Sequence, residues 1–259
     1  MSLTFRWLGV AGVELKVDGD VLAIDPFFTR PSLMGFLKPV IPDTRLISEK
    51  LPECHAVLVT HSHWDHLMDV PEVLRRTGAI AHGSANTCQL LRLQGVLESQ
   101  VKEIQVGDNL SLGAYEVDVI AGQHSWIPFS RFLNGALPSG LQPPLRLQDY
   151  RMDVCLGYRI RVCDTRVLLC AAKPQPADIL FIVAQEPRDY YQSLFQAVHP
   201  HTIVPIHWDN FLRPLDMPTH RFTRPGRMNL SKLARLAQQA LPQVNVIIPE
   251  MFREYALVG

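Results

Sequence analysis

The strongest constraint on this chain is an apolar run at residues 56–60 that leads without a break into the segment HSHWDH at residues 61–66. Apolar and β-branched residues predict a buried strand, so the polar segment begins where that strand ends. Side chains alternate along an extended chain, which places His61 and His63 on the same side. Imidazoles and a carboxylate gathered this closely suit a cation such as Zn²⁺ and leave coordination positions for water. The segment therefore predicts a metal site at the end of a buried strand.

Short β-type runs recur along the chain and alternate with helical patterns in its later part. The predicted strands are Thr4–Leu8, Val13–Val17, Val21–Ile24, Ala56–Thr60, Tyr115–Ile120, Gly157–Val162, Arg166–Leu169, Ile179–Val183, Thr202–Ile206 and Val244–Ile248. The predicted helices are Asp69–Arg76, Ala85–Gln94, Arg188–Val198 and Leu230–Ala240, the last with Asn229 as its N-cap. This mixture predicts one α/β domain over residues 1–259, with helices packed outside layered sheets.

Residues 125–152 fit neither pattern, because they hold four prolines, two glycines and several large apolar side chains. A loop of this length inside a compact domain is usually a lid or a binding loop. A plain surface insertion is the alternative, although such insertions seldom keep many large apolar residues. We therefore expect a lid whose Trp126, Phe129 and Phe132 line the substrate pocket, with a partner interface as the other use of these aromatic residues.

The 259 residues carry 25 Lys+Arg, 25 Asp+Glu and ten histidines. Zero net charge removes the positive surface that a nucleic-acid binder needs, so we expect a small-molecule substrate and no nucleic-acid partner. Five cysteines without a CxxC pair fit a reducing, cytoplasmic setting, and Cys170 is expected to be a small buried apolar residue. No run approaches the roughly 18 apolar residues of a membrane span, and a homo-oligomer stays open.

The HSHWDH segment and four further motifs resemble the metallo-β-lactamase superfamily, whose signature is HxHxDH after a buried strand. The further motifs are Phe5-Arg6-Trp7-Leu8-Gly9, Leu22-Ala23-Ile24-Asp25-Pro26-Phe27-Phe28, Gly122-Gln123-His124-Ser125-Trp126 and Val204-Pro205-Ile206-His207-Trp208-Asp209. They resemble the branch that contains L-ascorbate-6-phosphate lactonase and N-acyl-phosphatidylethanolamine phospholipase D. The resemblance implies an αββα sandwich with the metal site on one edge, between the two sheets.

The resemblance also implies two groups of metal ligands. By position, His61, His63 and His124 match the first metal site, and Asp65, His66 and His207 match the second. His124 and His207 each end or follow an apolar strand, which supports their assignment independently of the family. Asp25 matches a position that orients a ligand or braces the loop rather than binding the metal directly.

The chain departs from the family pattern where a strand ending in Gly-Asp-Thr delivers a carboxylate that bridges the two metals. Ala172 stands at that position, and no Asp or Glu lies between Thr165 and Pro176. Asp65 is then the one anionic residue among the six ligands, so repulsion between two cations is poorly offset. We expect one tightly bound ion, zinc or else manganese, and a weak or empty second site. Asp209 or Asp153 could substitute, although each is better explained as a solvated surface carboxylate.

The expected chemistry follows from the ligands. A bound Zn²⁺ lowers the pKa of its water toward about 7 and polarises a carbonyl or phosphoryl oxygen. Asp65 is placed to accept the proton of that water. The expected function is therefore hydrolysis of an ester, lactone or phosphodiester bond. The alternative is a non-catalytic or altered member that binds a metal or a small ligand, because Ala172 replaces the bridging carboxylate.

Overall fold

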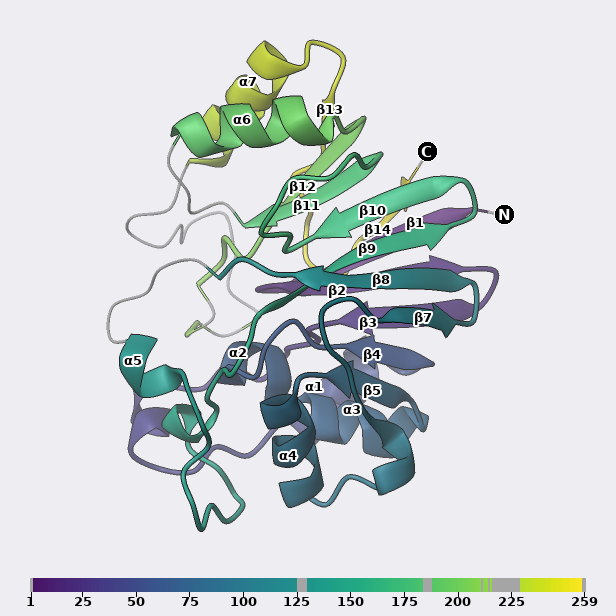
Figure 1. The fold of residues 1–259 in the computed structure, drawn as a ribbon. Coiled ribbons are helices and arrows are strands. Elements are labelled where there is room, and N and C mark those ends of the chain that lie inside the picture. The colour runs from purple at the N-terminus through teal and green to yellow at the C-terminus, as the bar shows by residue number, and fades with distance from the viewer. Residues whose placement is uncertain are drawn as a thin grey trace.

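The computed structural model describes residues 2–124, 130–183, 188–210, 212–213, 215 and 229–257. In this part of the chain, two mixed sheets of seven strands each pack face to face. Helices cover the outer faces of both sheets, so the predicted αββα sandwich is confirmed (Figure 1).

The strand order is β14-β1-β2-β3-β4-β5-β6 in the first sheet and β13-β12-β11-β10-β9-β8-β7 in the second. The first sheet contains β1 (Leu3–Gly9), β2 (Gly12–Val17), β3 (Asp20–Ile24), β4 (Ala56–Leu58), β5 (Ile80–Gly83), β6 (Val101–Glu103) and β14 (Glu254–Leu257). The second contains β7 (Asn109–Leu112), β8 (Tyr115–Ala121), β9 (Leu156–Val162), β10 (Thr165–Leu169), β11 (Ile179–Val183), β12 (Thr202–Ile206) and β13 (Asn245–Val246). Strands β3 to β6 and β10 to β13 are parallel, so the loops after β4 and β12 leave at carboxyl ends of parallel strands, where sites commonly form.

Two groups of helices complete the layers. The helices α1 (Thr44–Lys50), α3 (Val70–Thr77) and α4 (Ala85–Leu93) pack on the first sheet, and α6 (Arg188–Val198) and α7 (Leu230–Ala240) pack on the second (Figure 1). Short turns of helix are α2 (Trp64–Leu67), α5 (Ser130–Leu133), η1 (Leu33–Phe36), η2 (Glu98–Gln100) and η3 (Leu147–Asp149). The Asn229 side chain accepts the first free N–H groups of α7, as predicted. None of the helices in the described ranges is both long and apolar enough to cross a bilayer.

Strand β4 is buried on both faces, which explains its uninterrupted apolar sequence. Leu58 points into the core between the sheets, whereas Val57 points into the core beneath α1, α3 and α4. With apolar contacts on both sides, the strand is fixed in position, and the segment that follows it is delivered to one edge of the sandwich.

Two predicted strands are longer than those observed. The strand predicted over residues 56–60 ends at Leu58, because the N–H of Thr60 donates to the Asp25 carboxylate at 2.7 Å instead of continuing the ladder. The strand predicted over residues 244–248 is reduced to Asn245–Val246, which lies at the sheet edge and pairs with β12 alone. Strands β5, β6, β7 and β14 and helix α1 were not predicted, since each is short and several carry polar residues.

Candidate metal centre

The structure brings all six predicted ligands to one edge of the sandwich. The loop after β4 supplies His61, His63, Asp65 and His66, while His124 follows β8 and His207 follows β12. They form two trios, each with its candidate ligand atoms within 4.8 Å of one another: His61, His63 and His124 in the first, and Asp65, His66 and His207 in the second. The rings of His61 and His66 lie 3.8 Å apart between centroids, so the two trios adjoin.

The first trio has the arrangement of three imidazoles around one point. Ring centroids lie 4.7 Å apart for His61 and His63, 4.7 Å for His61 and His124, and 4.9 Å for His63 and His124. Each pair of rings is nearly perpendicular, with interplanar angles of 81°, 83° and 85°. The Nε2 atom of His61 is buried and has no hydrogen-bond partner within the described residues. A buried polar atom left unpaired costs about 1–3 kcal/mol, so this nitrogen fits a metal ligand.

Neighbouring oxygens fix the other nitrogens of these rings. The Nδ1 atom of His61 lies 3.0 Å from the Thr60 hydroxyl. The Nε2 atom of His63 lies 3.1 Å from both the Leu133 carbonyl and the Asn134 side-chain oxygen. Both oxygens are acceptors, so Nε2 of His63 carries the hydrogen and Nδ1 is left for a cation. The segment after residue 129 therefore helps to set the orientation of a candidate ligand.

In the second trio, Asp65 lies between two imidazoles. Its Oδ2 atom is 3.4 Å from Nε2 of His207 and 3.8 Å from Nε2 of His66. On its far side, His66 places Nδ1 2.7 Å from the buried carboxylate of Asp25, which also accepts the N–H of Thr60. Asp25 therefore contacts a candidate ligand from behind and closes the loop that carries it.

The charges of the two trios suit a cation. Burial, with the neighbouring imidazoles adding to it, holds the pKa of His61 well below its ordinary value and lowers that of His124 to about 4. Burial alone would lower the pKa of His66, but the Asp25 and Asp65 carboxylates raise it to about 9. Burial opposes ionisation of Asp65, yet His66 and His207 hold its pKa well below the usual range. The donor set thus offers neutral imidazoles in the first trio and an anion in the second, which fits a divalent cation.

Asp209 is neither a substitute ligand nor a solvated carboxylate. It is buried, and its Oδ1 atom accepts the N–H of Val10 at 3.0 Å. Its Oδ2 atom lies 3.0 Å from Nη1 of Arg30. The two atoms do not have hydrogen-bond geometry, so the contact is an ion pair held by electrostatic attraction. The N–H of His207 in turn donates to the Val10 carbonyl at 2.6 Å. Asp209 therefore braces the backbone on which His207 stands.

Sequence reasoning missed Arg30. Its side chain is buried against the ring of Phe27, and it interacts electrostatically with Asp209, Asp69 and Asp65. Gly9 has a φ of 97°, and a Cβ atom there would lie 2.4 Å from Nη2 of Arg30, so glycine at this position leaves room for the guanidinium. Burial lowers the pKa of Arg30, and the neighbouring carboxylates counter that effect.

Asp153 is not a substitute ligand either, because its carboxylate forms other hydrogen bonds. Its carboxylate accepts from the Ser84 hydroxyl at 2.7 Å and from the Asn86 N–H at 2.9 Å, both at the start of α4. Ala172 is exposed, and its N–H donates to the Ala121 carbonyl. Among the described residues, Asp65 is the one carboxylate in the two trios.

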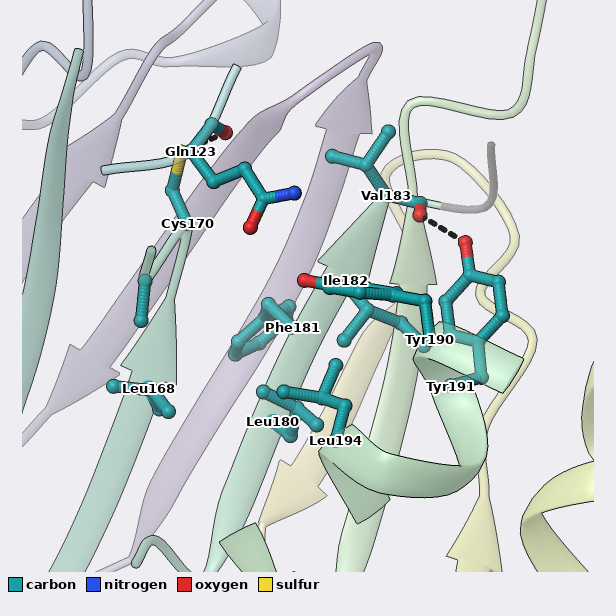
Figure 2. A pocket seen from close by; sticks show the side chains of 11 residues that line it. Gln123, Leu168, Cys170, Leu180, Phe181, Ile182, Val183, Tyr190, Tyr191 and Leu194 are labelled. Carbon is teal, nitrogen blue, oxygen red and sulfur yellow. Dashed lines mark hydrogen bonds between the residues drawn. The ribbon is translucent and has the colours of Figure 1, made fainter. Parts of the chain in front are cut away.

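The prediction for Cys170 holds in part, since the side chain is partly buried and packs against the core between the sheets. It is not fully buried, and its sulfur lies 3.6 Å from that of Cys155 and 3.4 Å from the Gln123 carbonyl. The hydrogen bond from Cys155 lowers the pKa of Cys170. Cys170 and Gln123 lie at one end of a cavity of about 50 Å³, whose other walls are apolar or aromatic and include Leu180 and Tyr190 (Figure 2).

The predicted lid is only partly described, since Trp126 and Phe129 lie outside the described residues. Its later part is anchored, because Leu145, Leu147 and Tyr150 are buried in the core beneath the first sheet. Phe132 is 60% exposed, so it does not line a closed pocket formed by the residues that the structure describes.

The sequence of this chain is similar to those of known metal-dependent hydrolases. A family model described as "Beta-lactamase superfamily domain" matches residues 21–170. A UPF0173 metal-dependent hydrolase from Pyrobaculum arsenaticum is 31% identical over 212 residues, which cover 81% of this chain and 85% of the relative. Another from Methanopyrus kandleri is 33% identical over 124 residues, and there the chain spans about half of the relative, 48%.

The solved structures show the same fold. Igni18, described as a novel metallo hydrolase from the hyperthermophilic archaeon Ignicoccus hospitalis, matches with a TM-score of 0.68 over 100% of both chains at 17% identity. These matches do not distinguish the lactonase and phospholipase branch, which stays a prediction.

Proposed function

Because the chain belongs to the UPF0173 metal-dependent hydrolase family of the beta-lactamase superfamily, we propose that it hydrolyses an ester, lactone or phosphodiester bond in a small molecule. The observation that carries the proposal is the buried Nε2 of His61, which has no hydrogen-bond partner among the described residues and belongs to a set of three nearly perpendicular imidazoles. A divalent cation, zinc or manganese, held by His61, His63 and His124 would supply Lewis acidity and make water a better nucleophile near neutral pH.

Asp65 is the proposed general base. Its carboxylate stays ionised because His66 and His207 hold its pKa low, and it lies in the trio that adjoins the first. A strongly ionised carboxylate is a weak base, so its role is to orient the attacking water and take its proton as the bond to the substrate forms. Asp25 acts through His66 and Asp209 through Val10, so both are positioning residues.

The proposed stoichiometry is one tightly held cation, because Asp65 is the single anion of the two trios and interacts electrostatically with the buried positive charge of Arg30. We expect about one metal per wild-type chain after dialysis, and a gain toward two in Ala172→Asp. Elemental analysis of both proteins measures this. Two tightly held metals in the wild type would show that another group has replaced the bridging carboxylate.

The test of the activity uses protein loaded with zinc or manganese and chromogenic esters, a lactone and a phosphodiester. We expect hydrolysis that falls at least about 100-fold on chelation and in the His61→Ala, His63→Ala double variant. His201→Ala is the matched control, since His201 is exposed and precedes β12, at the opposite end of that strand from His207. Activity that survives both chelation and the double substitution would contradict the proposal.

Loss of the bridging carboxylate favours one alternative, a protein that has kept the scaffold and binds a ligand without catalysis. The metal content of the purified protein distinguishes the hydrolase from this non-catalytic alternative. Less than roughly a tenth of an equivalent after purification with zinc or manganese present would support the alternative, because a hydrolase of this kind must retain its ion.

A further inference from the structure

Two cysteines lie together beside the metal centre. Cys155 immediately precedes β9 and Cys170 immediately follows β10, so the antiparallel pairing of these strands brings the two residues together. Their sulfurs are 3.6 Å apart, and both side chains are partly exposed. The other cysteines differ: Cys54 and Cys88 are buried, and Cys163 is exposed on the turn between β9 and β10.

The distance of 3.6 Å between the two sulfurs is typical of thiols that are in contact but not joined by a covalent bond. A disulfide has an S–S length of about 2.05 Å, so bond formation requires the sulfurs to approach by about 1.5 Å. Rotation of the side chains can supply part of this movement. Cys170 also has a left-handed backbone, with φ of 58°, which is unfavourable for a residue other than glycine and is held by its surroundings.

We propose that Cys155 and Cys170 are a reversible redox pair, which a hydroperoxide oxidises to a disulfide. In the first step, the Cys170 sulfur attacks a peroxide oxygen; an S–O bond forms, the O–O bond breaks, and water or an alcohol leaves. In the second step, the Cys155 sulfur attacks the sulfenic sulfur; the S–S bond forms, the S–O bond breaks, and water leaves. The two sulfurs together lose two electrons, and the peroxide gains them. A dithiol reductant reverses the reaction.

The pair is coupled to the metal centre through the backbone that carries His124. The Gly122 N–H donates to the Cys155 carbonyl and the Gln123 N–H to the Cys170 carbonyl, each at 3.0 Å. The segment that ends in His124 also packs tightly on the residue after Cys155, since a Cβ atom at Gly122 would lie 2.6 Å from the Leu156 carbonyl oxygen. Closing the disulfide therefore moves the segment that ends in His124. This consequence, unlike the disulfide itself, rests on the proposed function.

Peptide mapping tests the disulfide directly. Trypsin places three cysteines on separate peptides: Cys155 on 152–159, Cys163 on 162–166 and Cys170 on 167–188. After hydrogen peroxide and alkylation, we expect peptides 152–159 and 167–188 to be joined, with the mass lowered by the two hydrogens lost, and to separate on reduction. Cys163 is the internal control and should appear as a single oxidised or alkylated cysteine. Peroxide that oxidises Cys163 and leaves Cys155 and Cys170 both free to alkylate would overturn the proposal.

Single variants test the order of the steps. In Cys155→Ser, we expect Cys170 to stop at the sulfenic acid, which dimedone traps, and no joined peptide to form. Cys163→Ser should form the joined peptide as the wild type does. A joined peptide that contains Cys163 in the wild type, in place of either proposed cysteine, would contradict the assignment.

Metal retention tests the coupling separately. We expect the oxidised wild type to lose its metal to a chelator at least about tenfold faster than the reduced protein, and Cys155→Ser to show no such difference after the same treatment. Equal loss rates from oxidised and reduced protein would refute the coupling and leave the disulfide standing. A protein that never holds metal would instead refute the proposed function.

Discussion

At the scale of single residues, the candidate metal centre is surrounded by strained backbone. Val10, Asp25, Cys170 and His207 all have positive φ angles, between 45° and 58°, although none is glycine. Such a conformation costs roughly 1–2 kcal/mol per residue and persists only where surrounding contacts hold it. Here the contacts are visible: Asp25 is held by Thr60 and His66, and Val10 by Asp209 and His207.

Asp25→Asn tests the contact behind His66. Asparagine tolerates the left-handed backbone and keeps the shape, so the change mainly removes the negative charge that anchors Nδ1 of His66. We expect affinity for a metal at the second trio to fall about 10- to 100-fold, with the first trio affected less. Titration of Ala172→Asp with zinc, with and without Asp25→Asn, measures this. Equal second-site affinity in both proteins would show that Asp25 has only a structural part.

Arg30→Met tests the buried ion pair with Asp209. Removing one partner leaves the other charge buried and unpaired, so the free energy of unfolding should fall by about 3–5 kcal/mol. Arg166→Met is the matched control, because Arg166 pairs with Asp178 at the surface, and there the loss should be much smaller. Urea denaturation of both variants provides the comparison. Similar losses in the two would mean that burial of the Arg30 pair has little effect.

At the scale of elements, the parallel strands β3, β4 and β5 carry different features at their two ends. The carboxyl ends of β3 and β4 lead to Asp25 and to the candidate ligands, while residues at the amino ends of all three strands line a cavity of about 230 Å³ together with Ser111 and Tyr115. His82 of β5 lines this cavity, and its buried Nδ1 has no hydrogen-bond partner in the described part of the chain. The strand sequence fixes His82 on the inner face because Ala81 points toward the helices.

The buried His82 makes stability depend on pH. Burial, with Lys102 adding to it, lowers the pKa of His82 to about 4, whereas the unfolded chain titrates near 6.5. The unfolded state therefore binds the proton first, and stability is lost as the pH falls from about 6.5 to about 4. In His82→Leu this contribution disappears, so the wild type should lose about 3 kcal/mol more than the variant over that range. Urea denaturation of the chelated proteins at both pH values measures it, and parallel losses would contradict the burial of this ring.

At the scale of the whole molecule, two tyrosines of the second sheet tie it to the first. Tyr158 donates its hydroxyl to the Val59 carbonyl at 2.6 Å, close to the segment that holds the ligands. Tyr115 donates to the Leu15 carbonyl at 2.9 Å and the Asp20 carbonyl at 3.0 Å, beside the cavity of His82. Both rings are buried in the core between the sheets. The two sheets are therefore joined by the Tyr158 hydrogen bond near the candidate ligands and by the Tyr115 hydrogen bonds beside the cavity of His82.

Phenylalanine at each position separates stability from site geometry. Each change leaves at least one buried carbonyl without its donor, so each should lower the free energy of unfolding by about 1–3 kcal/mol. Only Tyr158→Phe should also speed the loss of metal to a chelator, since Val59 lies two residues before His61. Faster metal loss in Tyr115→Phe as well would show that the whole sandwich, rather than the local contact, controls the site.

The sequence alone located the candidate metal-binding segment and determined the layered fold. An apolar run followed by HSHWDH must place its histidines at a strand end, because a strand buried on both faces can carry polar ligands only beyond its end. Local patterns of this kind also located most of the central strands. They failed for β6 and β14, whose short and polar sequences are typical of loops and become strands only by pairing with a neighbour.

What only the tertiary structure decided is which distant residues meet around the ligands. Asp209 braces Val10 across 199 positions of the chain, Arg30 is buried beside Asp209, and the sulfurs of Cys155 and Cys170 come together through the pairing of β9 with β10. None of these contacts has a local signature, because propensity and periodicity act over a few residues, while the energy of a buried charge or thiol depends on the partners that the folded sheets bring to it.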